Sequence, residues 1–263
     1  MTYFPLYLAV GAGAGFLAGL LGVGGGLVIV PALVFAFEAQ HLPHVLHLAL
    51  GTSLASILFT SLSSIRGHHA RGAVNWRIVR DVTPGILLGT LVGATIVSQL
   101  PTRPLKIFFT AFVFYVGIQM LANVKPKPSR ELPGKGGMFA AGNVIGGVSS
   151  FVGIGGGSLS VPFMSWCNVK IHEAIGTSAA IGFPIALAGA AGYVVNGLAV
   201  GRDLPEWTLG FVYLPALAGI AAMSVLTAGL GARAAHRLPV AALKKTFAVL
   251  LLGIGAKMLW SLF

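Results

Sequence analysis

Charged residues are scarce in this chain. Only 9% of its 263 residues are Asp, Glu, Lys or Arg and 56% are apolar, against roughly 25% and 45–50% in soluble domains. A soluble protein of this size could not cover its surface with so few charges. Apolar runs of about 20 residues, long enough to cross a bilayer core of about 30 Å, predict spans at 44–65, 80–99, 104–123, 173–195, 208–231 and 240–262. The composition predicts an all-α polytopic membrane protein.

Basic residues are absent from the first part of the chain, and cysteine occurs only once. No basic residue precedes Arg66, so the start of the chain lacks the charged region of a cleavable signal peptide, and we expect the first apolar segment to stay in the mature protein. The single cysteine, Cys167, cannot form an intrachain disulfide. We expect it to be a small packed apolar residue and not a reactive thiol.

Acidic residues number only six against 17 Lys and Arg, which gives a net charge of +11. Such an excess can indicate nucleic-acid binding. Here, however, the basic residues lie in short loops between the predicted spans, where they set the orientation of membrane proteins. We therefore expect a multi-pass protein of the cell inner (plasma) membrane whose partners are the lipid bilayer and a small solute, with no nucleic acid; the oligomeric state stays open.

Glycine, by contrast, is abundant, and one glycine phrase occurs twice. Gly22-Val-Gly-Gly-Gly26 and Gly153-Ile-Gly-Gly-Gly157 interrupt two more apolar segments, 5–37 and 136–167. A helix broken inside a bilayer leaves free backbone N–H and C=O groups, which are tolerated only where they line a cavity or a ligand site. Paired breaks in the two halves of a chain are typical of transporters whose site lies between the halves.

The repetition extends over most of the chain. The matching segments are 15–31 with 146–162, 47–53 with 172–178, and 100–106 with 238–244. Residues 125–137 are polar and rich in Pro and Gly, as linkers are. We therefore predict a first membrane repeat at 1–124, a cytoplasmic linker at 125–137 and a second membrane repeat at 138–263.

Basic charge distinguishes parallel from inverted repeats. The loop at 66–80 holds four arginines, whereas its counterpart at 196–207 holds Arg202 and two acids. Placing 66–80, 124–137 and 232–245 in the cytoplasm puts 12 of the 17 basic residues there, which satisfies the positive-inside rule. This requires each glycine-broken segment to be a re-entrant hairpin with arms of about 12–16 residues, too short to span comfortably. We predict two inverted-topology repeats, each a re-entrant hairpin followed by three transmembrane helices, with both termini outside.

After each glycine cluster the sequence predicts a short helix, at 27–37 and 158–166. The first N–H groups of such helices favour anions by roughly 0.3–1 kcal/mol each, and up to about 2 when partly buried. Hydroxyl donors would come from Thr and Ser in the spans and, in the second half, from Ser149, Ser150 and Ser160 as well. The predicted substrate-binding residues are Gly22, Gly24, Gly25, Gly26, Thr52, Ser53, Gly153, Gly155, Gly156, Gly157, Ser158, Thr177 and Ser178. For each hydroxyl the alternative is a bond to the i−4 carbonyl or close packing.

Other glycines predict packing. Gly11, Gly15 and Gly19, and likewise Gly85, Gly89 and Gly93, repeat every four residues, as in close helix–helix contacts. Neither glycine cluster ends in the Gly-Lys-Ser/Thr of a nucleotide-phosphate loop. No nucleophile–base pair or carboxylate pair lies in the spans, so we expect no enzyme, no cofactor and no metal. His47 and His172 occupy equivalent positions, where they either relay protons or sit at the headgroup level.

The doubled glycine phrase with its following proline, the doubled His-x-Ala-Leu/Ile-Gly-Thr-Ser phrase and the basic loop from Arg66 to Trp76 resemble the sulfite exporter TauE/SafE family of membrane permeases. The resemblance implies a transporter of small anions of sulfur metabolism, such as sulfite or sulfonates, whose permeation site is formed by the glycine clusters and the Gly-Thr-Ser stretches. Leu27 stands where the second copy has Ser158, so we expect more hydroxyls from the second half. The leading hypothesis is a secondary transporter that works by alternating access, with export as the expected direction. The alternatives are an uptake permease for a related anion or thio-compound and a non-transporting membrane assembly factor.

Overall fold

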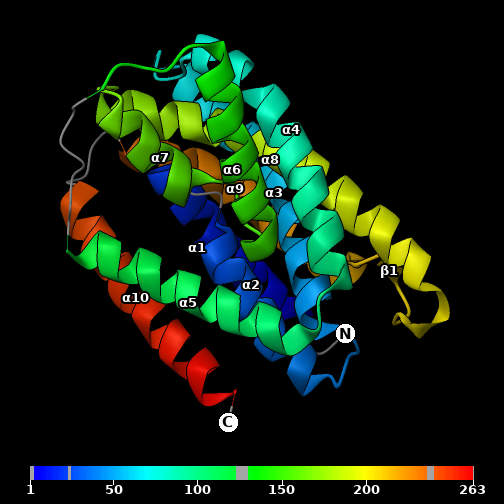
Figure 1. Ribbon diagram of the computed structural model, residues 1–263. Coiled ribbons are helices and arrows are strands. Elements are labelled where there is room, and N and C mark those ends of the chain that lie inside the picture. The colour runs from blue at the N-terminus through cyan, green and yellow to red at the C-terminus, as the bar shows by residue number, and fades with distance from the viewer. Residues whose placement is uncertain (1–2, 23–24, 123–129, 236–239, 263) are drawn as a thin grey trace.

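The computed structural model describes residues 3–22, 25–122, 130–235 and 240–262, without the side chains of residues 202 and 240–244. These residues form ten α-helices, a 3-10 turn and a two-stranded hairpin (Figure 1). In chain order the elements are α1 Phe4–Leu21, α2 Gly26–Ala39, α3 Val45–His69, α4 Trp76–Gln99, α5 Thr102–Leu121, α6 Lys135–Val152, α7 Gly157–Trp166, α8 Ile171–Val200, η1 Gly201–Asp203, β1 Thr208–Leu209, β2 Val212–Tyr213, α9 Leu214–Ala235 and α10 Val240–Trp260.

Six of the described helices are long and apolar enough to cross a membrane: α1, α3, α4, α5, α8 and α9. The prediction of a helical, multi-pass membrane protein is confirmed. The predicted span at 240–262 forms α10, which is not among the six. The two predicted short helices are present as α2 and α7.

The arms of the two glycine-broken segments are less even than predicted. Both first arms, α1 and α6, have 18 residues, whereas the second arms have 14 and 10. At 1.5 Å per residue, 18 residues extend about 27 Å. The predicted length of 12–16 residues is therefore wrong for both first arms, which are longer, and for α7, which is shorter; it holds only for α2. Helix α1 gains length at its start, where Pro5 lies in the first turn and removes no hydrogen bond.

The predicted span at 208–231 also needs correction, because helix α9 begins only at Leu214. The preceding residues pair as an antiparallel hairpin, Thr208 with Tyr213 and Leu209 with Val212. Gly210 adopts a left-handed φ of 55°, and the next N–H, that of Phe211, donates to the Tyr193 carbonyl on α8. Phe211 and Val212 are buried whereas Leu209 is exposed, so only the second side of the hairpin packs into the core.

The glycine stripes join the two halves of the chain. Helix α1 packs along α9 and helix α6 packs along α4. A Cβ added to Gly15 or Gly19 would lie 2.4 or 2.0 Å from backbone atoms of α9, and one added to Gly85 or Gly89 would lie 2.0 or 2.1 Å from backbone carbonyls of α6. The packing prediction is confirmed, and each stripe contacts a helix of the other half.

Helices α3 and α8 form the centre of the bundle, and α5 and α10 lie side by side at its periphery (Figure 1). The start of α8 lies beside the loop that follows α3, because Gly176 approaches Ala73. The start of α3 lies beside the loop that follows α8, because Gly51 approaches Phe211. The two central helices are therefore antiparallel.

Candidate functional site

The two glycine breaks have the same backbone geometry. Gly22 and Gly153 end the first arms with φ values of 67° and 65°, and Gly25 and Gly156 precede the second arms with φ values of 74° and 75°. All four are left-handed, a conformation that costs residues with a Cβ about 1–2 kcal/mol. Each break therefore needs glycine at both of its ends.

The breaks lie against each other inside the bundle. A Cβ added to Gly26, the first residue of α2, would lie 2.2 Å from the Gly153 carbonyl oxygen and 2.9 Å from the Ile154 Cα. Gly157 begins α7. Of the predicted site residues, Gly24 lies outside the described part of the chain. Since the first N–H groups of a helix have no acceptor within that helix, the starts of α2 and α7 bring open amides to this junction.

The serines of the two Gly-Thr-Ser phrases fasten the breaks. The Ser53 hydroxyl donates to the Gly153 carbonyl at 2.7 Å, and the Ser178 hydroxyl donates to the Gly22 carbonyl at 2.9 Å. Each serine thus satisfies the last carbonyl of the first arm in the opposite half. These two hydrogen bonds hold the breaks in place. While they are formed, the two hydroxyl protons cannot be donated to a ligand.

The threonines of the same phrases hold the loops. The Tyr213 N–H donates to the Thr52 Oγ1 and the Asn75 N–H donates to the Thr177 Oγ1, both at 2.9 Å. Tyr213 and Asn75 immediately precede α9 and α4. Both Gly-Thr-Ser phrases therefore make the same contacts in the two halves, and these contacts are structural.

Unpartnered hydroxyls lie at the second break. Ser149, near the end of α6, and Ser158, in the first turn of α7, are buried and make no hydrogen bond with any described residue. The Ser149 Oγ lies 3.4 Å from the Cβ position of Gly156. A buried hydroxyl without a partner costs about 1–3 kcal/mol, so these two groups are the ones that a ligand would satisfy.

The other two serines at this break are already bonded. Ser160 donates to the Ser178 hydroxyl at 2.8 Å, and Ser150 donates to the Gly147 carbonyl at 2.7 Å. At the positions equivalent to Ser149 and Ser158 the first half has Ala18 and Leu27. The second break therefore carries more hydroxyls than the first, as the sequence predicted.

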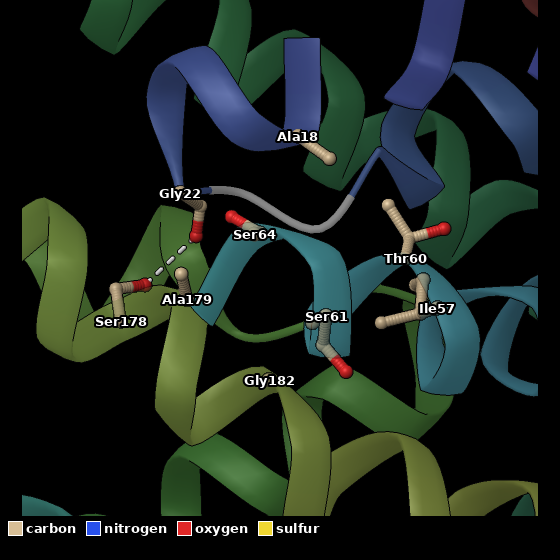
Figure 2. A pocket seen from close by; sticks show the side chains of 10 residues that line it. Ala18, Gly22, Ile57, Thr60, Ser61, Ser64, Ser178, Ala179 and Gly182 are labelled. Carbon is tan, nitrogen blue, oxygen red and sulfur yellow. Dashed lines mark hydrogen bonds between the residues drawn. The ribbon is translucent and has the colours of Figure 1, made fainter. Parts of the chain in front are cut away.

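A small cavity adjoins the breaks between α1, α3 and α8 (Figure 2). Figure 2 shows Gly22 and Ser178 facing each other with their hydrogen bond, and α3 beside them. The cavity measures about 10 Å³, close to the smallest space that holds one water molecule. It is lined by Ala18, Gly22, Ile57, Thr60, Ser61, Ser64, Gly155, Ser178, Ala179 and Gly182.

The three α3 hydroxyls in this lining were not predicted from the sequence. Thr60 bonds Ser224 of α9 at 2.6 Å and Ser61 donates to the Leu58 carbonyl at 3.0 Å, whereas the buried Ser64 hydroxyl makes no hydrogen bond with a described residue. A signal was present, because Thr52, Ser56, Thr60 and Ser64 recur every four residues and so share one face of a helix.

Comparison with known proteins settles the class of protein. A family model described as sulfite exporter TauE/SafE matches residues 7–258. This chain belongs to the TauE/SafE family. It is 39% identical to a probable membrane transporter protein of Haemophilus influenzae over 98% of both chains. It is 27% identical to a probable membrane transporter protein of Xylella fastidiosa over 99% of this chain and 97% of the other, and 26% identical to one of Methanocaldococcus jannaschii over 82% and 80%. No solved structure matches it.

As a TauE/SafE protein with six membrane-crossing apolar helices among its described residues, the chain is a multi-pass membrane transporter. Within the described residues no three His, Cys, Asp or Glu side chains gather as metal ligands would. The His47 Nε2 lies 3.1 Å from the Val97 carbonyl oxygen, and the His47 ring packs against the Phe211 ring, with the two ring centroids 5.2 Å apart. Cys167 is buried, and this burial raises the pKa of its thiol although Arg130 acts in the opposite direction.

Proposed function

We propose that this TauE/SafE protein is a secondary transporter that exports small sulfur-containing anions, such as sulfite or organosulfonates, across the cell inner (plasma) membrane. The observation that carries the proposal is the junction of the two breaks, where two helix starts and the unpartnered Ser149 and Ser158 hydroxyls come together. Each helix start favours an anion by up to about 2 kcal/mol when partly buried. That is less than the cost of desolvating an anion, so hydroxyls and water must share the binding.

We further propose that the two repeats, 1–124 and 138–263, have inverted topology and that each hairpin is re-entrant. Two contacts support this. Gln40, just after α2, donates to the Tyr7 hydroxyl near the start of α1 at 2.9 Å, so the first hairpin begins and ends at the same end of the bundle. The Arg130 guanidinium lies 4.7 Å from the Trp166 ring, which brings together the beginning and the end of the second hairpin. Because α3 and α8 are antiparallel, these are opposite ends.

The transport cycle requires movement. The cavity beside the breaks has room for about one water molecule, which is too small a space for a sulfur oxyanion. The cavity must therefore widen when the site opens to one side of the membrane and then to the other. The driving force is available without a nucleotide site. A monoanion that leaves the cell gains about 2.3 kcal/mol for each 100 mV of membrane potential. Export therefore needs no coupling ion, whereas uptake does.

The test is a flux and thermal-shift screen on purified protein in liposomes. Sulfite, thiosulfate, sulfoacetate and taurine are compared with acetate and with a neutral solute, at zero potential and with an imposed potential. We expect a sulfur anion to raise the unfolding temperature and to cross faster when the potential drives it outward. A preferential response to a neutral solute or a metal cation contradicts the anion site. Absence of flux with every solute favours the assembly-factor alternative, and flux only with an opposing ion gradient favours uptake.

A further inference from the structure

The cavity of Figure 2 lies on one side of the paired breaks, between helices of both halves. On α3 it extends from Ile57 to Ser64, toward the end of the helix at His69. On α8 it is lined by Ser178, Ala179 and Gly182, close to the start of that helix. Both stretches point to the same end of the bundle, the one that carries the basic loop at 66–80.

The repeat defines where a second, equivalent space would lie. The small residues Ala179 and Gly182 of the cavity correspond to Leu54 and Ile57 in the first half, and Thr60 corresponds to Ile185 in the second half. A molecule with two identical halves would have an equivalent cavity on the other side of the breaks. Here three of the equivalent positions carry larger, apolar side chains, whereas the positions equivalent to Ser61 and Ser64 carry the smaller Ala186 and Gly189.

Contacts show that this second space is filled. The Leu54 Cδ1 lies 2.7 Å from the Cβ position of Gly189, and the Ile185 Cδ1 lies 2.5 Å from the Cβ position of Gly156. Leu54 and Ile185 are each 0% exposed. Packed aliphatic side chains exclude water and strongly disfavour an unpaired anion.

We propose that the cavity is the vestibule through which the anion reaches the breaks from the 66–80 end, and that Leu54 and Ile185 form an apolar gate that closes the opposite path. The vestibule is also lined by Ser64, whose buried hydroxyl has no hydrogen-bond partner among the described residues. The inference rests on the proposed transport function, and it adds the side from which the site is reached and the residues that block the other side.

Accessibility of equivalent cysteines tests the vestibule without any substrate. Cys167→Ser removes the single native cysteine. In this background Ser61→Cys reports on the cavity and Ala186→Cys on the equivalent filled position, and both native residues are buried. The exposed Arg71→Cys and Glu206→Cys mark the two ends of the bundle. A membrane-impermeant maleimide is applied to sealed vesicles of either orientation.

We expect Ser61→Cys to be labelled from the side that labels Arg71→Cys, about tenfold faster than Ala186→Cys from either side, because a thiol reacts only where water reaches it. Adding Leu54→Ala and Ile185→Ala should make Ala186→Cys reactive from the Glu206→Cys side. Leu48→Ala, an equally buried leucine of α3, is the matched control and should leave it unreactive. Equal labelling of the two reporters, or labelling of Ser61→Cys from the Glu206→Cys side alone, overturns the inference.

The two proposals fail separately. If Ser61→Cys is labelled from one side only and the protein transports no solute, the transport proposal is wrong while the vestibule and gate remain supported. Measured flux of sulfite together with two-sided labelling would overturn the vestibule and gate alone.

Discussion

The hydroxyl of Ser53 donates a 2.7 Å hydrogen bond to the carbonyl of Gly153, a residue of the opposite half of the chain. Ser178 and Gly22 repeat this bond at 2.9 Å. The last carbonyl of each first arm is thereby satisfied by a helix of the other repeat, where water is excluded. The two bonds hold each break against a central helix of the other half.

Replacing Ser53 or Ser178 by alanine should lower stability. Each change leaves a buried carbonyl without its donor, which costs about 1–3 kcal/mol. Thermal unfolding in detergent measures the loss. Ser98→Ala in α4 is the control. Among the described residues the Ser98 hydroxyl bonds only the i−4 carbonyl of Ala94, so its removal should cost little. Equal unfolding temperatures for the three variants would contradict a fastening role.

Ser149→Ala and Ser158→Ala should behave in the opposite way. Neither hydroxyl has a partner among the described residues, so its removal should leave the unfolding temperature unchanged or slightly higher. If these hydroxyls contact the anion, the loss of a charged hydrogen bond of about 1.5–3 kcal/mol should raise KM roughly tenfold or more. Liposome flux at varied substrate concentration measures KM, and an unchanged KM in the double variant would remove both serines from the site.

Gly156→Val should abolish transport. The left-handed φ of 75° disfavours any Cβ, and this Cβ would lie 2.5 Å from the Ile185 Cδ1. Gly25→Val, with φ 74°, should do the same. The matched control is Gly13→Val, because the Cβ position of Gly13 has no atom within 4 Å. We expect wild-type flux from the control at equal expression; flux retained in Gly156→Val would show that the break is dispensable.

Cys167 should label slowly. Burial raises the pKa of its thiol, so less thiolate is present near neutral pH than at an exposed cysteine. The maleimide rate of the native protein should therefore be lower than that of Arg71→Cys in the Cys167→Ser background, and it should keep increasing to a higher pH. Equal rates and equal pH profiles would contradict the burial of this residue.

The breaks, the short helices and the glycine stripes could be predicted from the sequence because glycine has few other uses inside a helix. The left-handed Gly22 and Gly25 and the close approach at Gly19 follow from the missing Cβ alone. The partners of hydroxyls could not be predicted in this way. Ser53 bonds a carbonyl a hundred positions away, and only the packing of α6 against the first half brings that group within reach.

The cavity was missed for a related reason. Its shape depends on small residues of α8, such as Ala179 and Gly182, beside the α3 residues that line it. A hydroxyl at every fourth residue is equally compatible with bonding to the i−4 carbonyl. The hairpin at 208–213 was missed because two strands of two residues are too short to show an alternating pattern. Left-handed Trp207 and Gly210 fix it instead.

The interleaved packing of α1 on α9 and of α6 on α4 has a mechanical consequence. Backbone-to-backbone contact along the glycine stripes holds each of these helix pairs tightly together. Each rigid unit of this molecule therefore consists of a hairpin from one half packed against the fourth helix of the other half. Dividing the chain between the two repeats would therefore give two polypeptides that each hold only one partner of both helix pairs. Neither polypeptide should fold without the other.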